Sequence, residues 1–144
     1  MRAFTDLYMA LDATTSSNAK LAAMVDYFGR AAPEDAAWAV YFLAGGKPRQ
    51  LVPTKVMREF ALRSAGIPEW LFDESYQSVG DLAETIALLS PQPPGESTAG
   101  LAVWMEDKLL PLRGLAPEEL LVRMEALWRE LDTRGRFILS LIHI

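Results

Sequence analysis

The sequence predicts an all-α protein, a single irregular bundle of about seven or eight helices. Apolar residues recur at helical spacing through most of the chain, and no segment alternates apolar and β-branched residues as a strand does. Proline followed by two acidic residues, a pattern typical of a first helical turn, occurs twice. With 144 residues, 51% of them hydrophobic, the chain can bury one core and is too apolar for wholesale disorder.

The first half of the chain contains four predicted helices. They span residues 2–12, 19–30, 33–44 and 54–65. Thr, Ser and Asn residues at 14–18 are N-cap candidates for the second helix. Pro33, with two acids after it, opens the third helix, and Gly45 with Gly46 ends it. We expect Thr54 to cap the fourth helix, which follows a polar loop rich in Gly and Pro.

The second half continues in the same way. Further helices are predicted from Pro68 onward and over residues 81–89, 101–110 and 117–133. The Pro-, Gly- and Ser-rich segment 91–100 is typical of a solvated connector, and too few residues follow it for a second independent core. The four tryptophans fall on apolar helix faces, so we expect them in the core.

Composition limits the chemistry and the location. Cysteine is absent, which excludes disulfides, thiolate metal sites and a Cys nucleophile. The N-terminus has no uninterrupted apolar region of the kind found in a signal peptide, and the longest uncharged apolar run, residues 36–46, is too short to span a bilayer. These features predict a soluble cytoplasmic protein.

The distribution of charge matters more than the net value of -5. Residues 1–63 have a net charge of +2, whereas residues 64–144 have a net charge of -7. Within residues 45–63 there are five basic side chains and one acidic side chain. A local basic segment in an acidic chain is compatible with an anionic partner, because partner choice follows the local field.

No catalytic constellation emerges from the residue types. The one histidine, His143, lies next to the C-terminus, where we expect a frayed residue rather than a catalytic group or metal ligand. Asp81 and Glu84 could belong to a metal-dependent enzyme, but two carboxylates are fewer ligands than a Mg²⁺ or Ca²⁺ site normally gathers. An acidic first helical turn is the alternative interpretation of this pair.

The segment after the third helix also has two interpretations. Gly45-Gly46-Lys47 lacks the G-x-x-x-x-G-K-S/T spacing of a phosphate loop. Backbone N–H groups at the helix start near Lys55 could receive a phosphate oxygen, with Lys47 and Arg49 supplying further positive charge. The alternative is an ordinary loop with solvated charges.

Seven segments of the chain follow one another in a specific order. They are T-x-x-N-A-K-L-A-A-M-V-x-Y-F (15–28), A-W-A-V-Y-F-L-A-G-G-K (37–47), P-T-K (53–55), P-E-W-L-F-D-E-S-Y (68–76), V-G-D-L-A-E-T (79–85), W-M-E-D-K-L-L-P-L-R-G-L (104–115) and R-F-I-L (136–139). In this order they closely resemble the N-terminal DNA-binding domain of bacterial ATP-dependent DNA ligases. The resemblance implies an all-helical domain that grips the minor-groove side of nicked duplex DNA through its backbone. The parent would seal nicks in DNA repair, replication and recombination.

The resemblance also implies a set of DNA contacts. They lie in the turn before the second helix, in the loop that follows the third and in the turn at Gly80. The candidates are Thr15, Ser17, Asn18, Lys20, Gly46, Lys47, Arg49, Pro53, Thr54, Lys55 and Gly80. Capping residues, glycines and cations are suited to binding phosphates without reading bases. The implied partners are nicked duplex DNA and the catalytic domains of the parent, with no membrane, in the bacterial cytoplasm at the nucleoid.

The chain lacks the residues that carry the family's catalysis. Family ligases use ATP and Mg²⁺ to form a Lys-AMP intermediate on a K-x-D-G motif, and none of the lysines here begins that motif. The sequence departs from the family pattern at Ser140, so we expect one domain over residues 1–139 and an atypical tail, 140–144, from truncation or an out-of-frame read. The alternative function is a helical protein-protein interaction module that does not bind DNA.

Overall fold

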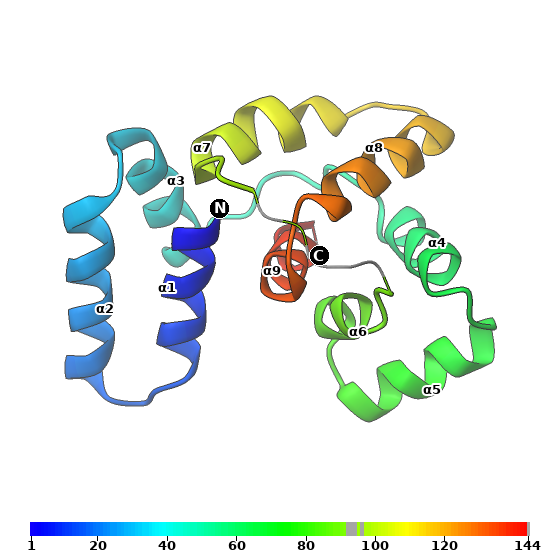
Figure 1. Ribbon diagram of the computed structural model, residues 1–144, viewed down its shortest axis with the longest axis horizontal. Coiled ribbons are helices and arrows are strands. Elements are labelled where there is room, and N and C mark those ends of the chain that lie inside the picture. The colour runs from blue at the N-terminus through cyan, green and yellow to red at the C-terminus, as the bar shows by residue number, and fades with distance from the viewer. Residues whose placement is uncertain (92–94, 96, 144) are drawn as a thin grey trace. The chain divides into compact units, whose positions relative to one another are not determined.

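The computed structural model describes residues 1–91, 95 and 97–143, with the side chain of His143 outside that description. The described residues form nine α-helices, and no β-strand occurs among them (Figure 1). The predicted all-α class is therefore confirmed, with slightly more helices than expected. Residues 92–94 and 96 of the predicted connector lie outside the described residues.

The helices divide between two compact units, each built from two stretches of chain. The first unit contains Met1–Lys47 and Ser97–Lys108, and the second contains Pro48–Glu96 and Leu109–Ile144. The first holds α1 (Arg2–Asp12), α2 (Ser17–Arg30), α3 (Pro33–Leu43) and α7 (Leu101–Val103). The second holds α4 (Thr54–Ala65), α5 (Glu69–Val79), α6 (Leu82–Leu88), α8 (Pro117–Arg129) and α9 (Thr133–His143). A π-helical turn over Trp104–Leu109 and a 3-10 turn over Leu110–Leu112 follow α7.

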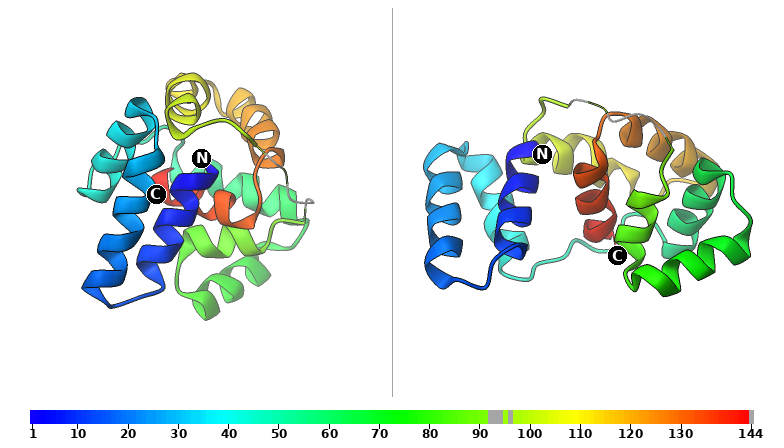
Figure 2. Two further views of the ribbon diagram at one scale, coloured as in Figure 1. Left: turned by 60° about the vertical axis from the view of Figure 1, so that its left-hand side comes forward. Right: turned by 60° about the horizontal axis from the view of Figure 1, so that its bottom comes forward.

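The first unit is built on a helical hairpin. Helices α1 and α2 run antiparallel and side by side (Figure 1; Figure 2). The turn between them is fixed by Ser16, whose Oγ accepts the N–H of Ala19 at 3.3 Å and caps α2. Phe4 of α1 packs its ring against Tyr27 of α2 and Phe42 of α3, with centroids 6.4 and 5.9 Å apart. This aromatic cluster joins three helices in one core.

Polar contacts hold the segment before α7 in the same unit. Asp35, in the first turn of α3, accepts the backbone N–H of Ala102 at 2.8 Å through Oδ1. The α-amino group of Met1 donates to the carbonyl oxygen of Ala99 at 2.6 Å. The Pro33 helix start that the sequence predicts is confirmed. One of the acids after it therefore also receives an N–H from a helix distant in sequence.

The burial of Tyr27 predicts that the stability of the first unit falls at alkaline pH. Tyr27 is buried, and burial, with a smaller contribution from Asp35, raises the pKa of Tyr27 above its usual value of 10.0. Above about pH 10 the unfolded chain loses this proton before the folded chain does, so stability falls as pH rises. We expect urea unfolding from pH 8 to 11 to show this loss, and Tyr27→Phe to reduce its slope. Tyr76→Phe, at an exposed phenol, is the matched control and should leave the slope unchanged.

The second unit is a cluster of crossing helices. Helix α6 packs along α9, α4 packs against α8, and α5 packs against α6 (Figure 2). The rings of Phe60 in α4 and Trp128 in α8 meet edge to face with centroids 5.3 Å apart. Phe72 of α5 and Ile86 of α6 are 1% and 2% exposed. Every helix of this unit therefore contributes at least one side chain to a buried interior.

A buried arginine connects three parts of this unit. Arg136 of α9 is 1% exposed; its Nε donates to the carbonyl oxygen of Trp128 at 3.0 Å, and its Nη1 donates to Ser90 Oγ at 3.2 Å. The indole Nε1 of Trp128 donates to the same Ser90 Oγ at 2.6 Å. Burial lowers the pKa of Arg136, while the carboxylate of Asp132 opposes that shift. The guanidinium remains charged.

Ser140 occupies the interior without using its hydroxyl. The residue is fully buried in α9, and its Oγ has no hydrogen-bond partner among the described residues. Because an unpaired buried hydroxyl is unfavourable, we expect Ser140→Ala to raise the free energy of unfolding by about 1 kcal/mol. Urea denaturation measures the change. Ser64→Ala, at a half-exposed position in α4, controls for helix propensity and should stay within about 0.5 kcal/mol; an equal gain there would contradict the burial argument.

The N-cap of α4 and the burial of Trp70 differ from the sequence predictions. Thr54 was expected to cap α4, but the N-cap residue is Pro53 and Thr54 is the first residue of the helix. The prediction that all four tryptophans lie in the core is wrong for Trp70, which is 66% exposed. Trp104 and Trp128 are buried as predicted.

No helix within the described residues is both long and apolar enough to cross a bilayer.

Candidate nucleic-acid interface

The start of α2 offers unpaired backbone donors. Ser16 Oγ accepts a hydrogen bond from the N–H of Ala19, and Thr14 Oγ1 accepts one from the N–H of Ser16 at 3.1 Å. The N–H groups of Ser17 and Asn18 are left without partners among the described residues, as expected for the first positions of a helix. Both side chains are exposed, as is Thr15, and Lys20 follows one turn later. Donors at a helix start, with a cation close by, are suited to a phosphate oxygen. The members of this group are Thr15, Ser17, Asn18 and Lys20.

The end of α3 determines the path of the chain into Lys47. Gly45 has φ +87°, its N–H donates to Phe42, and the Gly46 N–H donates to the carbonyl oxygen of Tyr41 at 2.8 Å. This pair of bonds is a Schellman motif. A Cβ on Gly46 would lie 2.5 Å from both Tyr41 Cε2 and Tyr41 O, so no larger side chain fits there. Packing alone therefore requires Gly46, and the motif leaves the Lys47 side chain exposed.

The loop before α4 is anchored by apolar residues and has polar groups on its surface. Leu51 and Val52 are buried, which fixes the middle of the loop. Gln50 Nε2 donates to Thr54 Oγ1 at 3.1 Å, tying the loop to the first turn of the helix. Pro53, Thr54 and Lys55 are exposed at that start, and Arg49 is exposed in the loop. The backbone N–H groups of Thr54 and Lys55 have no partner among the described residues.

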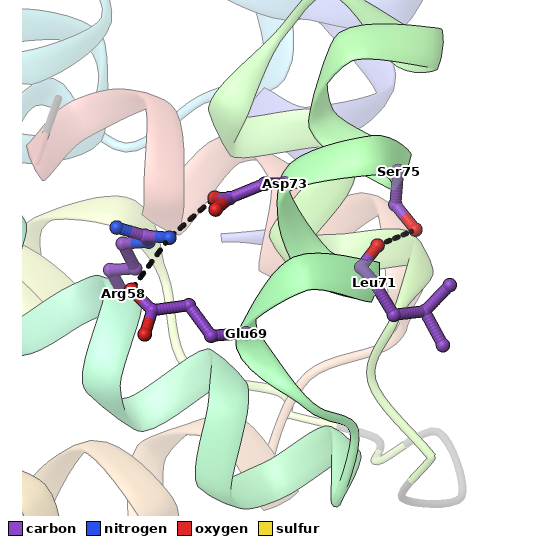
Figure 3. Close-up of polar contacts among 5 residues, drawn as sticks. All are labelled: Arg58, Glu69, Leu71, Asp73 and Ser75. Carbon is purple, nitrogen blue, oxygen red and sulfur yellow. Dashed lines mark hydrogen bonds and ion pairs between the residues drawn. The ribbon is translucent and has the colours of Figure 1, made fainter.

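Ion pairs divide the basic segment 45–63 into two groups. Arg58 contacts Asp73 and lies 3.2 Å from Glu69, both on α5 (Figure 3). Arg63 pairs with Glu59 at 2.6 Å. The other three cations of the segment have no carboxylate partner among the described residues. These are Lys47, Arg49 and Lys55.

Gly80 ends helix α5 in a backbone conformation that favours glycine. Its φ is +82°, and its N–H donates to the carbonyl oxygen of Tyr76 at 2.8 Å. The next residue, Asp81, caps α6 by accepting the N–H of Glu84 at 2.7 Å. This contact supports the acidic-first-turn interpretation of Asp81 and Glu84. Two carboxylates at this turn also make it a less favourable place for a phosphate than the starts of α2 and α4.

The predicted DNA contacts are divided between the two units. Thr15, Ser17, Asn18, Lys20, Gly46 and Lys47 belong to the first, and Arg49, Pro53, Thr54, Lys55 and Gly80 belong to the second. Sequence reasoning missed Gln50, because a hydrogen bond between its side chain and Thr54 has no signature beyond a polar residue near a helix start. These contacts stay predictions.

A comparison with protein families identifies the chain. A family model described as DNA ligase N terminus matches residues 1–143. The chain belongs to the DNA ligase N-terminal family. This family match confirms the resemblance seen in the sequence, and it covers both units and all of the predicted contact residues. None of the curated proteins compared with the chain matches it.

Proposed function

We propose that this DNA ligase N-terminal chain binds nicked duplex DNA without sequence specificity, as part of a bacterial ATP-dependent DNA ligase. The observation that carries the proposal is the set of three cations, Lys47, Arg49 and Lys55, that have no carboxylate partner among the described residues. In a chain of net charge -5 that belongs to a ligase family, such cations are suited to phosphate binding.

The chemistry of the candidate groups favours phosphates over bases. Backbone N–H groups at the starts of α2 and α4 can donate to phosphate oxygens, and the nearby lysines add charge that is independent of sequence. Reading base edges requires side chains such as Arg, Asn or Gln held in a fixed orientation, whereas Asn18 and Arg49 are exposed and no side-chain hydrogen bond within the described residues fixes them. We infer that these contacts position DNA for other domains.

ATP and Mg²⁺ belong to the parent enzyme in this proposal. The residues of this chain do not fit that chemistry, because none of the four lysines begins K-x-D-G. The described residues also contain no group of three or more His, Asp or Glu side chains placed to hold a metal ion. We therefore assign this chain DNA binding alone, with repair, replication and recombination in the bacterial cytoplasm as the setting of the parent.

A gel-shift titration tests the proposal. The chain should retain a labelled nicked duplex at about 50 mM salt and release it progressively by about 200 mM, since each phosphate contact contributes to the salt dependence. An unlabelled duplex of scrambled sequence with the same nick should compete equally. Absence of any retention at the lower salt concentration would contradict DNA binding and favour the protein-interaction alternative.

A further inference from the structure

A shallow groove of about 400 Å³ lies between helices α5 and α6 of the second unit. Leu71 and Ser75 lie on the side of α5 away from Glu69 and Asp73, which face Arg58 (Figure 3). The groove is therefore on a different face of α5 from the Arg58 ion pairs. Its lining consists of Leu71, Glu74, Ser75, Ser78, Val79, Thr85, Leu88 and Leu89.

The hydroxyl groups in the lining are occupied by the helices themselves. Ser75 Oγ donates to the carbonyl oxygen of Leu71 at 2.8 Å, and Ser78 Oγ donates to that of Glu74 at 2.9 Å. Thr85 Oγ1 donates to the Asp81 carbonyl oxygen at 2.6 Å. Because these donors are already used, the groove presents mainly methyl and methylene groups to a ligand.

Large apolar side chains of the groove are exposed to solvent. Leu88 is 58% exposed, and Leu71 and Val79 are each 37% exposed. Single exposed apolar residues are ordinary, but these three line the same groove, so an apolar ligand that enters it would cover all of them. Trp70, 66% exposed, lies one turn before Glu74 on the same helix.

The lining of the groove contains one charged residue, the acidic Glu74, and no basic residue. Between Arg63 and Lys108 the sequence contains no basic residue, whereas α5, α6 and the turn between them carry five acids. Arg58 is engaged by Glu69 and Asp73. Glu74 lines the groove and has no ion-pair partner within the described part of the chain. The carboxylate of Glu74 makes the groove complementary to a cationic ligand.

We propose that this groove binds a basic amphipathic helix of a partner protein. Apolar side chains one turn apart would enter between α5 and α6 and cover Leu88, and a Lys or Arg of the partner would pair with Glu74. A helix fits because side chains at i, i+3, i+4 and i+7 form a ridge that packs between two helices. None of the three cations proposed to bind DNA lines this groove, so the groove would give the chain a protein partner in addition to DNA.

A labelled peptide tests the proposal. The probe is a helical peptide of about 16 residues with leucines at i, i+3, i+4 and i+7 and lysines on its other faces. Fluorescence anisotropy with the whole chain should show binding at least about 10-fold tighter than that of a scrambled peptide of the same composition. Leu88→Ser and Glu74→Lys should each weaken binding by about 3- to 10-fold. Val122→Ser, at a 69% exposed residue on α8, is the matched control and should leave the affinity unchanged.

The outcomes separate this proposal from others. Equal affinity for the two peptides, or unchanged affinity of Leu88→Ser, would overturn it, because binding would then follow charge alone. Self-association of the free chain in sedimentation that Leu88→Ser abolishes would also overturn it and assign the groove to a second copy. Retention of nicked DNA by Leu88→Ser is measured alongside and is expected to match that of the unsubstituted chain. Loss of the peptide site is thus distinguished from failure of DNA binding.

Discussion

Reversing the charge of Lys47, Arg49 and Lys55 together is expected to weaken binding to a nicked duplex by at least about 100-fold at ~50 mM salt. Each side chain is exposed and has no carboxylate partner among the described residues, so its charge is available to a phosphate. The slope of log K against log salt should become shallower by about two to three units, since each phosphate contact contributes about 0.9. Gel shifts across a salt series give both quantities.

A second variant controls for the change in total charge. Arg113 and Arg134 are also exposed and have no carboxylate partner among the described residues, but neither belongs to the predicted contacts. Reversing both shifts the net charge in the same direction and should leave the slope within about half a unit of the original. A triple variant that keeps the original salt slope would sink the assignment of these three cations to DNA.

The sequence predicts only some of the ion pairs that leave Lys47, Arg49 and Lys55 as the cations without a carboxylate partner among the described residues. The sequence places five basic residues in segment 45–63, and the pairing of Arg63 with Glu59 could be read from their i, i+4 spacing. The pairing of Arg58 with Glu69 and Asp73 could not, because it depends on how α5 folds back onto α4. Tertiary structure therefore selects which cations keep an available charge.

Helix starts were predictable where the signal is local. Pro33 and Pro117 open helices as expected, because proline and first-turn acids act within one turn. The predicted helix over 117–133 is wrong at its end: α8 stops at Arg129, and Asp132 receives the Gly135 N–H at the start of α9. Buried Leu131 continues the apolar spacing across the break, so periodicity alone could not locate it.

Periodicity also failed to orient α5. The run Trp70, Leu71, Phe72 contains three consecutive apolar residues, which point in three directions around a helix. Phe72 is 1% exposed and Trp70 is 66% exposed, because only one of the three can face the core. The turn at Gly80, by contrast, was predictable from glycine between two helical segments, and its positive φ agrees with that reading.

The predicted boundary at residue 139 cuts through a helix of the second unit. Helix α9 runs from Thr133 to His143, and Ser140 and Ile142 are both buried within it. Ser140 and Ile142 of the predicted tail therefore belong to the buried interior of the second unit. The R-F-I-L motif in the same helix begins with Arg136, so one of the residues that carried the family resemblance is buried in the second unit.

Replacing Arg136 is expected to have the largest effect on stability. Arg136→Ala removes two donors and a cation near the C-terminal end of α8 and leaves a cavity beside the ring of Trp128, whose centroid lies 5.8 Å from the guanidinium carbon. We expect the free energy of unfolding to fall by about 3 to 5 kcal/mol. Urea denaturation followed by far-UV circular dichroism measures it, with Arg134→Ala on the exposed face of α9 as the matched control, expected within about 0.5 kcal/mol.

Two further variants separate the charge of Arg136 from its shape. Arg136→Met keeps most of the side-chain volume and removes the cost of burying a charge, so its loss should be smaller, about 1 to 3 kcal/mol. Arg136→Lys keeps the charge, but a single ammonium cannot reproduce the planar fork that reaches both Trp128 O and Ser90 Oγ. If hydrogen-bond geometry dominates, lysine should be no better than methionine. A lysine variant as stable as the original chain would show instead that positive charge near the end of α8 is what this position requires.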